Sequence, residues 1–312
     1  MTFVEKEGGL HNFGHTCYIN CIIQCLAHSR TFSTNVIQNT APLKCKCENS
    51  FCLKEWLCQI FVELISKEEV VKLNLDDLKN LLNELSKQKE KVYEKYMIDK
   101  ADTVEGFLYD LLHILAAECD KSEDGDIYII RLFLGSLALQ RSVNVVNPYQ
   151  HHILSLHIVH GDILERNNNF EYAVGEMWKN LMVQCDCKLA YRELAKISIQ
   201  PKYMVFVNDE FPENFTPPMS LGVSPYATKK ALVFHVKGEV KQVKGKVKRE
   251  ECHFYTVVQV LDHVWFKYDD DKIGKPVAEE DIFKTDNEPS LLYYAREGAQ
   301  WSCIGARDLN GF

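Results

Sequence analysis

The chain has 312 residues, of which 46% are hydrophobic and 26% charged, a composition that supports one large domain or two modest ones with a sizeable core. The formal net charge of −8 argues against a general nucleic-acid binder, because such proteins need a basic surface to neutralise phosphates. The sequence has neither an apolar run of about 18 residues nor the apolar segment of a signal peptide, so we expect no membrane span and a cytoplasmic or nuclear location.

The first third of the chain predicts helices. The first expected helix begins at Cys17, with Thr16 as its cap, and runs to about residue 29. Three more segments place apolar residues at helical spacing, and they cover residues 53–65, 73–89 and 102–117.

The chain from about residue 123 onward predicts strands. Short β-branched and aromatic segments are separated by Gly, Pro, Asn and Asp clusters, as in antiparallel sheets. These segments cover residues 127–139, 151–159, 202–207, 231–236, 254–261, 263–268 and 290–295, with one helical patch at 171–182. The piece 237–248 alternates Lys with Val and predicts an exposed hairpin at a sheet edge. Helices followed by strands indicate an α+β fold with a cleft between its two parts.

Cys17 is the strongest candidate nucleophile among the 12 cysteines. It lies at the beginning of the expected helix, where unpaired amides and the helix dipole favour a thiolate. Cys21 and Cys25 lie one and two turns deeper, and we interpret them as small core residues.

A thiol nucleophile needs a base, and His253 with Asp269 is the candidate pair. His253 begins one expected strand and Asp269 ends the next, so a hairpin would bring the two side chains together. His263 is the rival base, but it falls in the expected turn between these strands.

Residues 9–26, GLHNFGHTCYINCIIQCL, resemble the cysteine box of the ubiquitin-specific proteases, G-L-x-N-x-G-N-T-C-Y-x-N-x-x-x-Q-x-L. The matching residues are Gly9, Leu10, Asn12, Gly14, Thr16, Cys17, Tyr18, Asn20, Gln24 and Leu26. Residues 253–270 are similar to the histidine box of that family, in which a G-H-Y strand leads to W-x-x-F-D-D. The order and spacing of the weaker matches between the boxes agree from about residue 9 to residue 296.

The resemblance implies one catalytic domain over residues 1–312 with a papain-like cysteine peptidase fold. A helical thumb would cover about 9–122, and β-rich fingers and palm about 123–312. Cys17 would attack the carbonyl of the C-terminal glycine of ubiquitin, and His253, oriented by Asp269, would act as general base and acid. Asn12 would donate to the oxyanion.

Some positions depart from the family pattern. His15 replaces Asn before the nucleophile, and Glu251 and Cys252 replace the Gly before the base. Two alternatives therefore stand beside a deubiquitinase: an inactive ubiquitin-binding relative of the same fold, and a protease for another ubiquitin-like modifier.

We expect no cofactor. The zinc site of many family members needs two C-x-x-C pairs, whereas only Cys185 and Cys187 stand in that region. A second cluster has a spacing unlike a zinc pair set and is a weak candidate site. Its members are Cys45, Cys47, Cys52 and Cys58. The expected partners are ubiquitin or ubiquitinated proteins, with no nucleic acid and no membrane, and we expect a monomer.

Overall fold

The structure is a computed structural model. It describes residues 8–38, 51–66, 69–86, 96–97, 103–118, 157–160, 203–209, 219–223, 232–243, 253–261, 264–282 and 289–296. The expected strand at 127–139, the helical patch at 171–182 and the histidine His263 lie outside these residues.

Helices fill the described part of the first 118 residues. They are α1 (Cys17–Ala27), α2 (Arg30–Ile37), α3 (Leu53–Ser66), α4 (Leu75–Ser86) and α5 (Val104–Glu118). The four helices expected from the sequence are confirmed to within a few residues at each end. Helix α2 was not expected, because its Ser, Thr and Asn residues make its sequence polar and its apolar pattern weak. Its apolar face is made of Phe32 and Val36, which lie one turn apart and are both buried.

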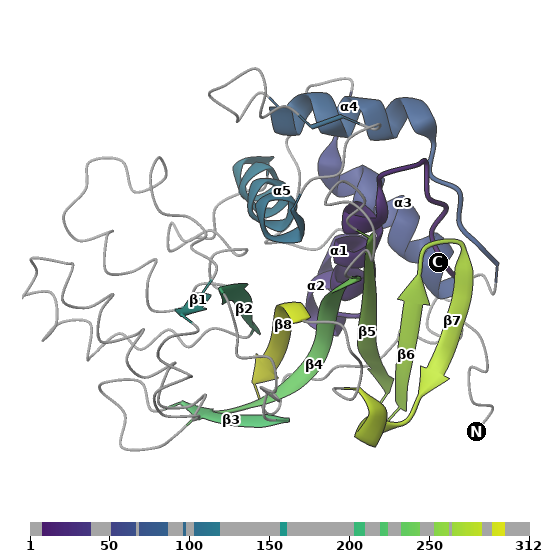
Figure 1. The fold of residues 1–312 in the computed structure, drawn as a ribbon. Coiled ribbons are helices and arrows are strands. Elements are labelled where there is room, and N and C mark those ends of the chain that lie inside the picture. Colours follow the sequence, from purple (N-terminus) through teal and green to yellow (C-terminus); the bar gives the residue numbers. More distant parts are fainter. Residues whose placement is uncertain are drawn as a thin grey trace, which may run out of the picture.

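Strands of the later part form one sheet (Figure 1). They are β1 (His157–His160), β2 (Tyr203–Asp209), β3 (Ser220–Val223), β4 (Leu232–Val243), β5 (His253–Leu261), β6 (Val264–Asp269), β7 (Lys272–Val277) and β8 (Pro289–Arg296). Among the described residues the strand order is β1-β2-β8-β4-β5-β6-β7, with β3 paired to β4. Strands β1 and β2 are parallel, and the other pairs are antiparallel. Helices followed by a largely antiparallel sheet confirm the expected α+β class.

The expected edge hairpin at 237–248 is wrong for its first half. Residues up to Val243 continue β4, which lies inside the sheet: Val240 pairs with Thr256 of β5 on one side and with Leu291 of β8 on the other. Alternation of Lys and Val marks a strand with two unlike faces, but it does not say how many neighbours the strand has. Residues 244–248 lie outside the described part.

Helix α1 lies at the centre of the described fold, where it contacts β5 and β6 as well as α2, α3 and α5. Every residue of α1 is buried. Tyr18 meets Phe107 of α5 edge to face at 5.4 Å between ring centroids, and Cys25 meets Thr256 of β5 at 3.3 Å. The helix is therefore held on the sheet side and on the helical side at once. None of the described helices is both long enough and apolar enough to cross a membrane.

Candidate active site

An extended segment, residues 8–12, leads into α1 and is called the strap below. It joins the helical part to the sheet: the Leu10 N–H donates to the Asp270 carbonyl oxygen at 3.0 Å, just beyond β6. On its other side the Val71 N–H donates to Gly9 at 2.8 Å, and the His11 N–H donates to Val71 at 2.9 Å. The strap therefore fixes the start of α1 relative to the end of β6.

Two amide side chains of α1 donate hydrogen bonds to backbone carbonyls of the strap. Asn20 Nδ2 donates to the Leu10 carbonyl oxygen at 3.2 Å, and Gln24 Nε2 donates to the Gly8 carbonyl oxygen at 3.0 Å. Both amides are buried, and a buried backbone carbonyl needs a hydrogen-bond partner within the protein because water cannot reach it. They explain physically why an Asn and a Gln occupy these two positions of a buried helix.

Asn12 organises the turn before the nucleophile. Its Oδ1 accepts from the Gly14 N–H at 2.9 Å, the Thr16 N–H at 3.2 Å and the Thr16 hydroxyl at 3.2 Å. Gly14 has a φ of 117°, which favours glycine. Thr16 occupies the expected cap position, but its side chain makes no cap hydrogen bond, because its Oγ1 instead accepts from Phe13 N–H and donates to Asn12. The loop thus delivers Cys17 as the first residue of α1.

Cys17 is in hydrogen-bond contact with His253, so the structure brings these two predicted site residues together. Cys17 as a residue is 3% exposed. The other two cysteines of α1 have no such partner cation: burial raises the pKa of Cys21 well above its ordinary value and raises the pKa of Cys25 to about 12. Among these three thiols, Cys17 alone stands beside a base.

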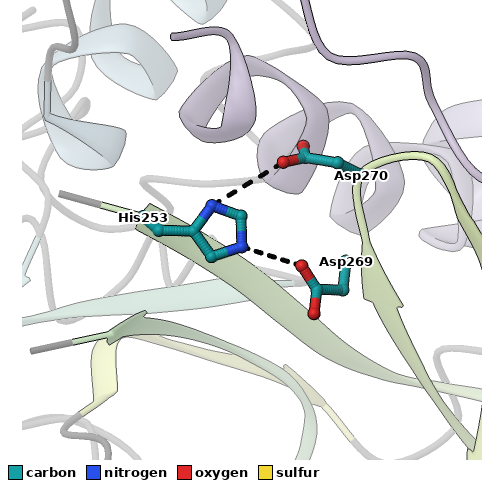
Figure 2. Close-up of side chains that lie close together, drawn as sticks. All are labelled: His253, Asp269 and Asp270. Atoms are coloured by element: carbon teal, nitrogen blue, oxygen red, sulfur yellow. Dashed lines mark hydrogen bonds and ion pairs between the residues drawn. The ribbon is translucent and has the colours of Figure 1, made fainter. Parts of the chain in front are cut away.

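His253 and Asp269 meet through the hairpin of β5 and β6 (Figure 2). His253 Nε2 donates to Asp269 Oδ1 at 2.7 Å, while Nδ1 lies 3.7 Å from Asp270 Oδ2. The hydrogen bond with Asp269, followed by that with Cys17, raises the pKa of His253 to about 10. The same bond lowers the pKa of Asp269 below its usual range. The site therefore favours an imidazolium beside a carboxylate.

Further contacts fix Asp269 itself. Its Oδ2 accepts from Lys272 Nζ at 2.7 Å, and Lys267 Nζ lies 3.7 Å away. The preceding residue, Tyr268, bonds through its hydroxyl to Nε2 of buried His28 at 3.2 Å, and His28 Nδ1 donates to the Gln24 carbonyl oxygen at 2.8 Å. A neutral His28 with its proton on Nδ1 satisfies both bonds. The end of β6 is thereby anchored to the end of α1.

Asp270 is a part of the site to which the sequence analysis gave no role. Its carboxylate accepts from Asn12 Nδ2 and from Asn20 Nδ2, each at 2.7 Å, and lies 3.7 Å from His253 Nδ1. Burial raises the pKa of Asp270 despite these bonds. The carboxylate therefore ties the turn before Cys17 to the region of the base, and its sequence signal was its place as the second Asp of the W-x-x-F-D-D pattern.

His253, Asp269 and Asp270 are the one group among the described residues with enough nearby His, Cys, Asp or Glu ligand atoms for a metal ion. Figure 2 shows the two carboxylates approaching different nitrogens of the ring. Of the weak zinc candidates, Cys52 is buried and Cys58 contacts the Ile37 carbonyl oxygen at 3.8 Å. Cys45 and Cys47 lie outside the described residues.

Comparisons with known proteins agree with the resemblance in the sequence. A family model described as ubiquitin carboxyl-terminal hydrolase matches residues 8–294. A curated Arabidopsis thaliana protein, ubiquitin carboxyl-terminal hydrolase 21, is 22% identical over 341 residues. That alignment covers 96% of this chain but 43% of the relative, so the chain spans less than half of that protein's length.

Two solved structures are similar in fold. The SAGA Ubp8/Sgf11/Sus1/Sgf73 DUB module bound to ubiquitin aldehyde aligns with a TM-score of 0.54 at 16% identity, covering 93% of this chain and 69% of that one. The Saccharomyces cerevisiae apo Pan2 pseudoubiquitin hydrolase-RNA exonuclease module aligns with a TM-score of 0.66 at 13% identity, covering 97% and 58%. At these identities the likeness shows the fold alone.

Proposed function

Because the chain belongs to the ubiquitin carboxyl-terminal hydrolase family, with its papain-like α+β fold, we propose that it is an active thiol hydrolase that cleaves the bond after the C-terminal glycine of ubiquitin. One observation carries the proposal: Cys17 begins a buried helix in hydrogen-bond contact with His253, whose Nε2 donates to Asp269 at 2.7 Å. A nucleophile, a base and an orienting carboxylate in that order are the requirements of thiol acyl transfer.

Proton transfer follows from the pKa of His253. In the proposed reaction the ring accepts the thiol proton as general base, and with a pKa of about 10 it holds that proton as an imidazolium at neutral pH. The Cys17 thiolate attacks the glycine carbonyl, the tetrahedral adduct collapses, and His253 gives its proton to the departing amine. Water then attacks the thioester, with the imidazole as base, and releases the ubiquitin carboxylate.

Asn12 is the proposed donor to the oxyanion. Its Nδ2 carries two hydrogens, of which one is used by Asp270, and its Oδ1 is fixed by the loop before Cys17. The other hydrogen can therefore meet an oxyanion beside Cys17 from an amide that is already held in place. Loss of such a donor typically lowers turnover about 100- to 1000-fold.

The inactive alternative has one specific observation in its favour, the fold similarity to a pseudoubiquitin hydrolase. Against it, this chain keeps a thiol, an imidazole and a carboxylate in contact with one another. A protease for another ubiquitin-like modifier would use the same three groups. Only an experiment can therefore show which modifier the protein cleaves.

The test is labelling with a ubiquitin probe that carries a C-terminal electrophile, together with hydrolysis of a fluorogenic ubiquitin amide. Wild type should be labelled once and should turn over the amide, and Cys17→Ala should do neither. Cys58→Ala, which removes a half-buried thiol on α3, is the matched control and should behave as wild type. Probe binding without labelling would support the inactive relative, and labelling by another modifier's probe alone would support the third reading.

A further inference from the structure

Asp271 is an exposed residue of the β6–β7 turn that makes two hydrogen bonds to the strap through one oxygen. Its Oδ1 accepts from the Asn12 backbone N–H at 2.9 Å and lies 2.9 Å from His11 Nδ1. The side chains of Asp271 and His11 are 55% and 37% exposed. Nothing in the proposed chemistry so far uses either residue.

The first of these bonds fixes the backbone of Asn12, the residue that carries the proposed oxyanion donor. The backbone of Asn12 is held by Asp271, while its side chain is held by Asp270 on one end and by the loop amides on the other. Without Asp271, the Asn12 peptide could rotate, its side-chain contacts with Asp270 and the loop would loosen, and Nδ2 would shift relative to Cys17. Catalytic groups tolerate little displacement, since about 1 Å can lower the rate roughly 100-fold.

We propose that Asp271 and His11 form a positioning pair that fixes Asn12 for oxyanion stabilisation, an inference that rests on the proposed hydrolase function. His11 holds the carboxylate in place: its ring packs edge to face on Phe13 at 4.8 Å and donates to the same oxygen that receives the Asn12 N–H. The pair therefore joins the strap to the turn that also carries Asp269 and Asp270.

A purely electrostatic role for Asp271 gives a different expectation. A third carboxylate near His253 would act through its charge, and Asp271→Asn would then lower activity as much as Asp271→Ala. Positioning needs only the acceptor oxygen, which Asn retains. Asp271→Asn should therefore stay within about threefold of wild type, whereas Asp271→Ala should lower kcat roughly 10- to 100-fold with KM within about twofold.

The experiment measures two rates for each variant: turnover of the fluorogenic ubiquitin amide, and alkylation of Cys17 by iodoacetamide. Alkylation requires the thiolate but no oxyanion donor, so a positioning defect lowers kcat and leaves alkylation unchanged. His11→Ala should cause a smaller loss than Asp271→Ala, and the double variant should be no worse than Asp271→Ala alone. Glu280→Ala, which removes another exposed carboxylate shortly after β7, is the control and should match wild type.

Three outcomes overturn the inference. They are wild-type kcat in Asp271→Ala, an equal loss in Asp271→Asn, and a parallel loss of alkylation that would indicate a disturbed thiolate. In each case the wild-type turnover still supports the hydrolase. If wild type itself turns over no ubiquitin substrate, the proposed function fails and the positioning role falls with it.

Discussion

Gly9→Ala is the substitution that tests how closely the strap packs on the β6–β7 turn. A Cβ at this position would lie 2.5 Å from the carbonyl oxygens of both Asp270 and Lys272. Both oxygens are backbone atoms, so no rotamer change can make room. We expect the strap to move away from the turn.

The size of that movement follows from the contacts. A real Cβ essentially never approaches a heavy atom closer than 3.0 Å, so each of the two 2.5 Å contacts must lengthen by half an ångström or more. The Leu10–Asp270 hydrogen bond, now 3.0 Å, would stretch with it. Overpacking of this kind lowers the free energy of unfolding by about 1–3 kcal/mol. Asn12, three residues along the strap, would be displaced as well, and turnover should fall roughly 10- to 100-fold.

Chemical denaturation and hydrolysis of the fluorogenic ubiquitin amide measure the two effects separately. Gly106→Ala on α5 is the control for turnover, because its Cβ would chiefly meet the Thr103 hydroxyl at 2.9 Å, which accepts from the Gly106 N–H at the start of that helix. It can change stability through this bond but should leave turnover unchanged. Wild-type stability together with wild-type turnover in Gly9→Ala would refute the close packing of strap and turn.

The remaining predictions concern the base and the buried thiols. Asp269→Asn should lower the pKa of His253 from about 10 toward its ordinary value, and NMR titration of the ring should detect the shift; an unchanged pKa would mean that Asp269 does not set it. Because the pKa of His253 in the folded state is raised above 6.5, its contribution to stability is fully present below pH 6.5 and is lost as the pH rises through about 10. Denaturation curves should therefore show the stability difference between wild type and Asp269→Asn shrinking over that interval, and a growing difference would contradict the sign. Cys21 and Cys25 should resist iodoacetamide at pH 7 in the folded protein, as peptide mass spectrometry would show, since burial keeps them protonated; modification of either as fast as Cys17 would be inconsistent with this.

Local sequence patterns predicted the elements that carry the chemistry. The helix beginning at Cys17 has a loop, a cap position and apolar periodicity, all of which are short-range signals. The hairpin that brings Asp269 to His253 follows from two strands and a short turn. Four of the five helices in the described part could be predicted for the same reason.

Contacts between distant segments could not be predicted in this way. Asp270 and Asp271 belong to the same Asp-rich turn, and nothing local says that one would hold Asn12 and Asn20 while the other would hold the strap. The interior position of β4 was missed because partners, and not composition, decide where a strand lies in a sheet. The roles of Asn12 and Asp269 in catalysis remain predictions until activity is measured.

The strap and the β6–β7 turn also set when the proposed site can form during synthesis of the protein. Asn12 and Asp270 are 258 positions apart along the chain, yet they share a hydrogen bond. At translation rates of about 5–20 residues per second, Cys17 leaves the ribosome roughly 10–50 s before the turn that completes its surroundings. Until then its thiol has neither its base nor a fixed Asn12. The nascent chain therefore carries an unassisted cysteine, and the proposed site is complete only when the late strands have joined the sheet.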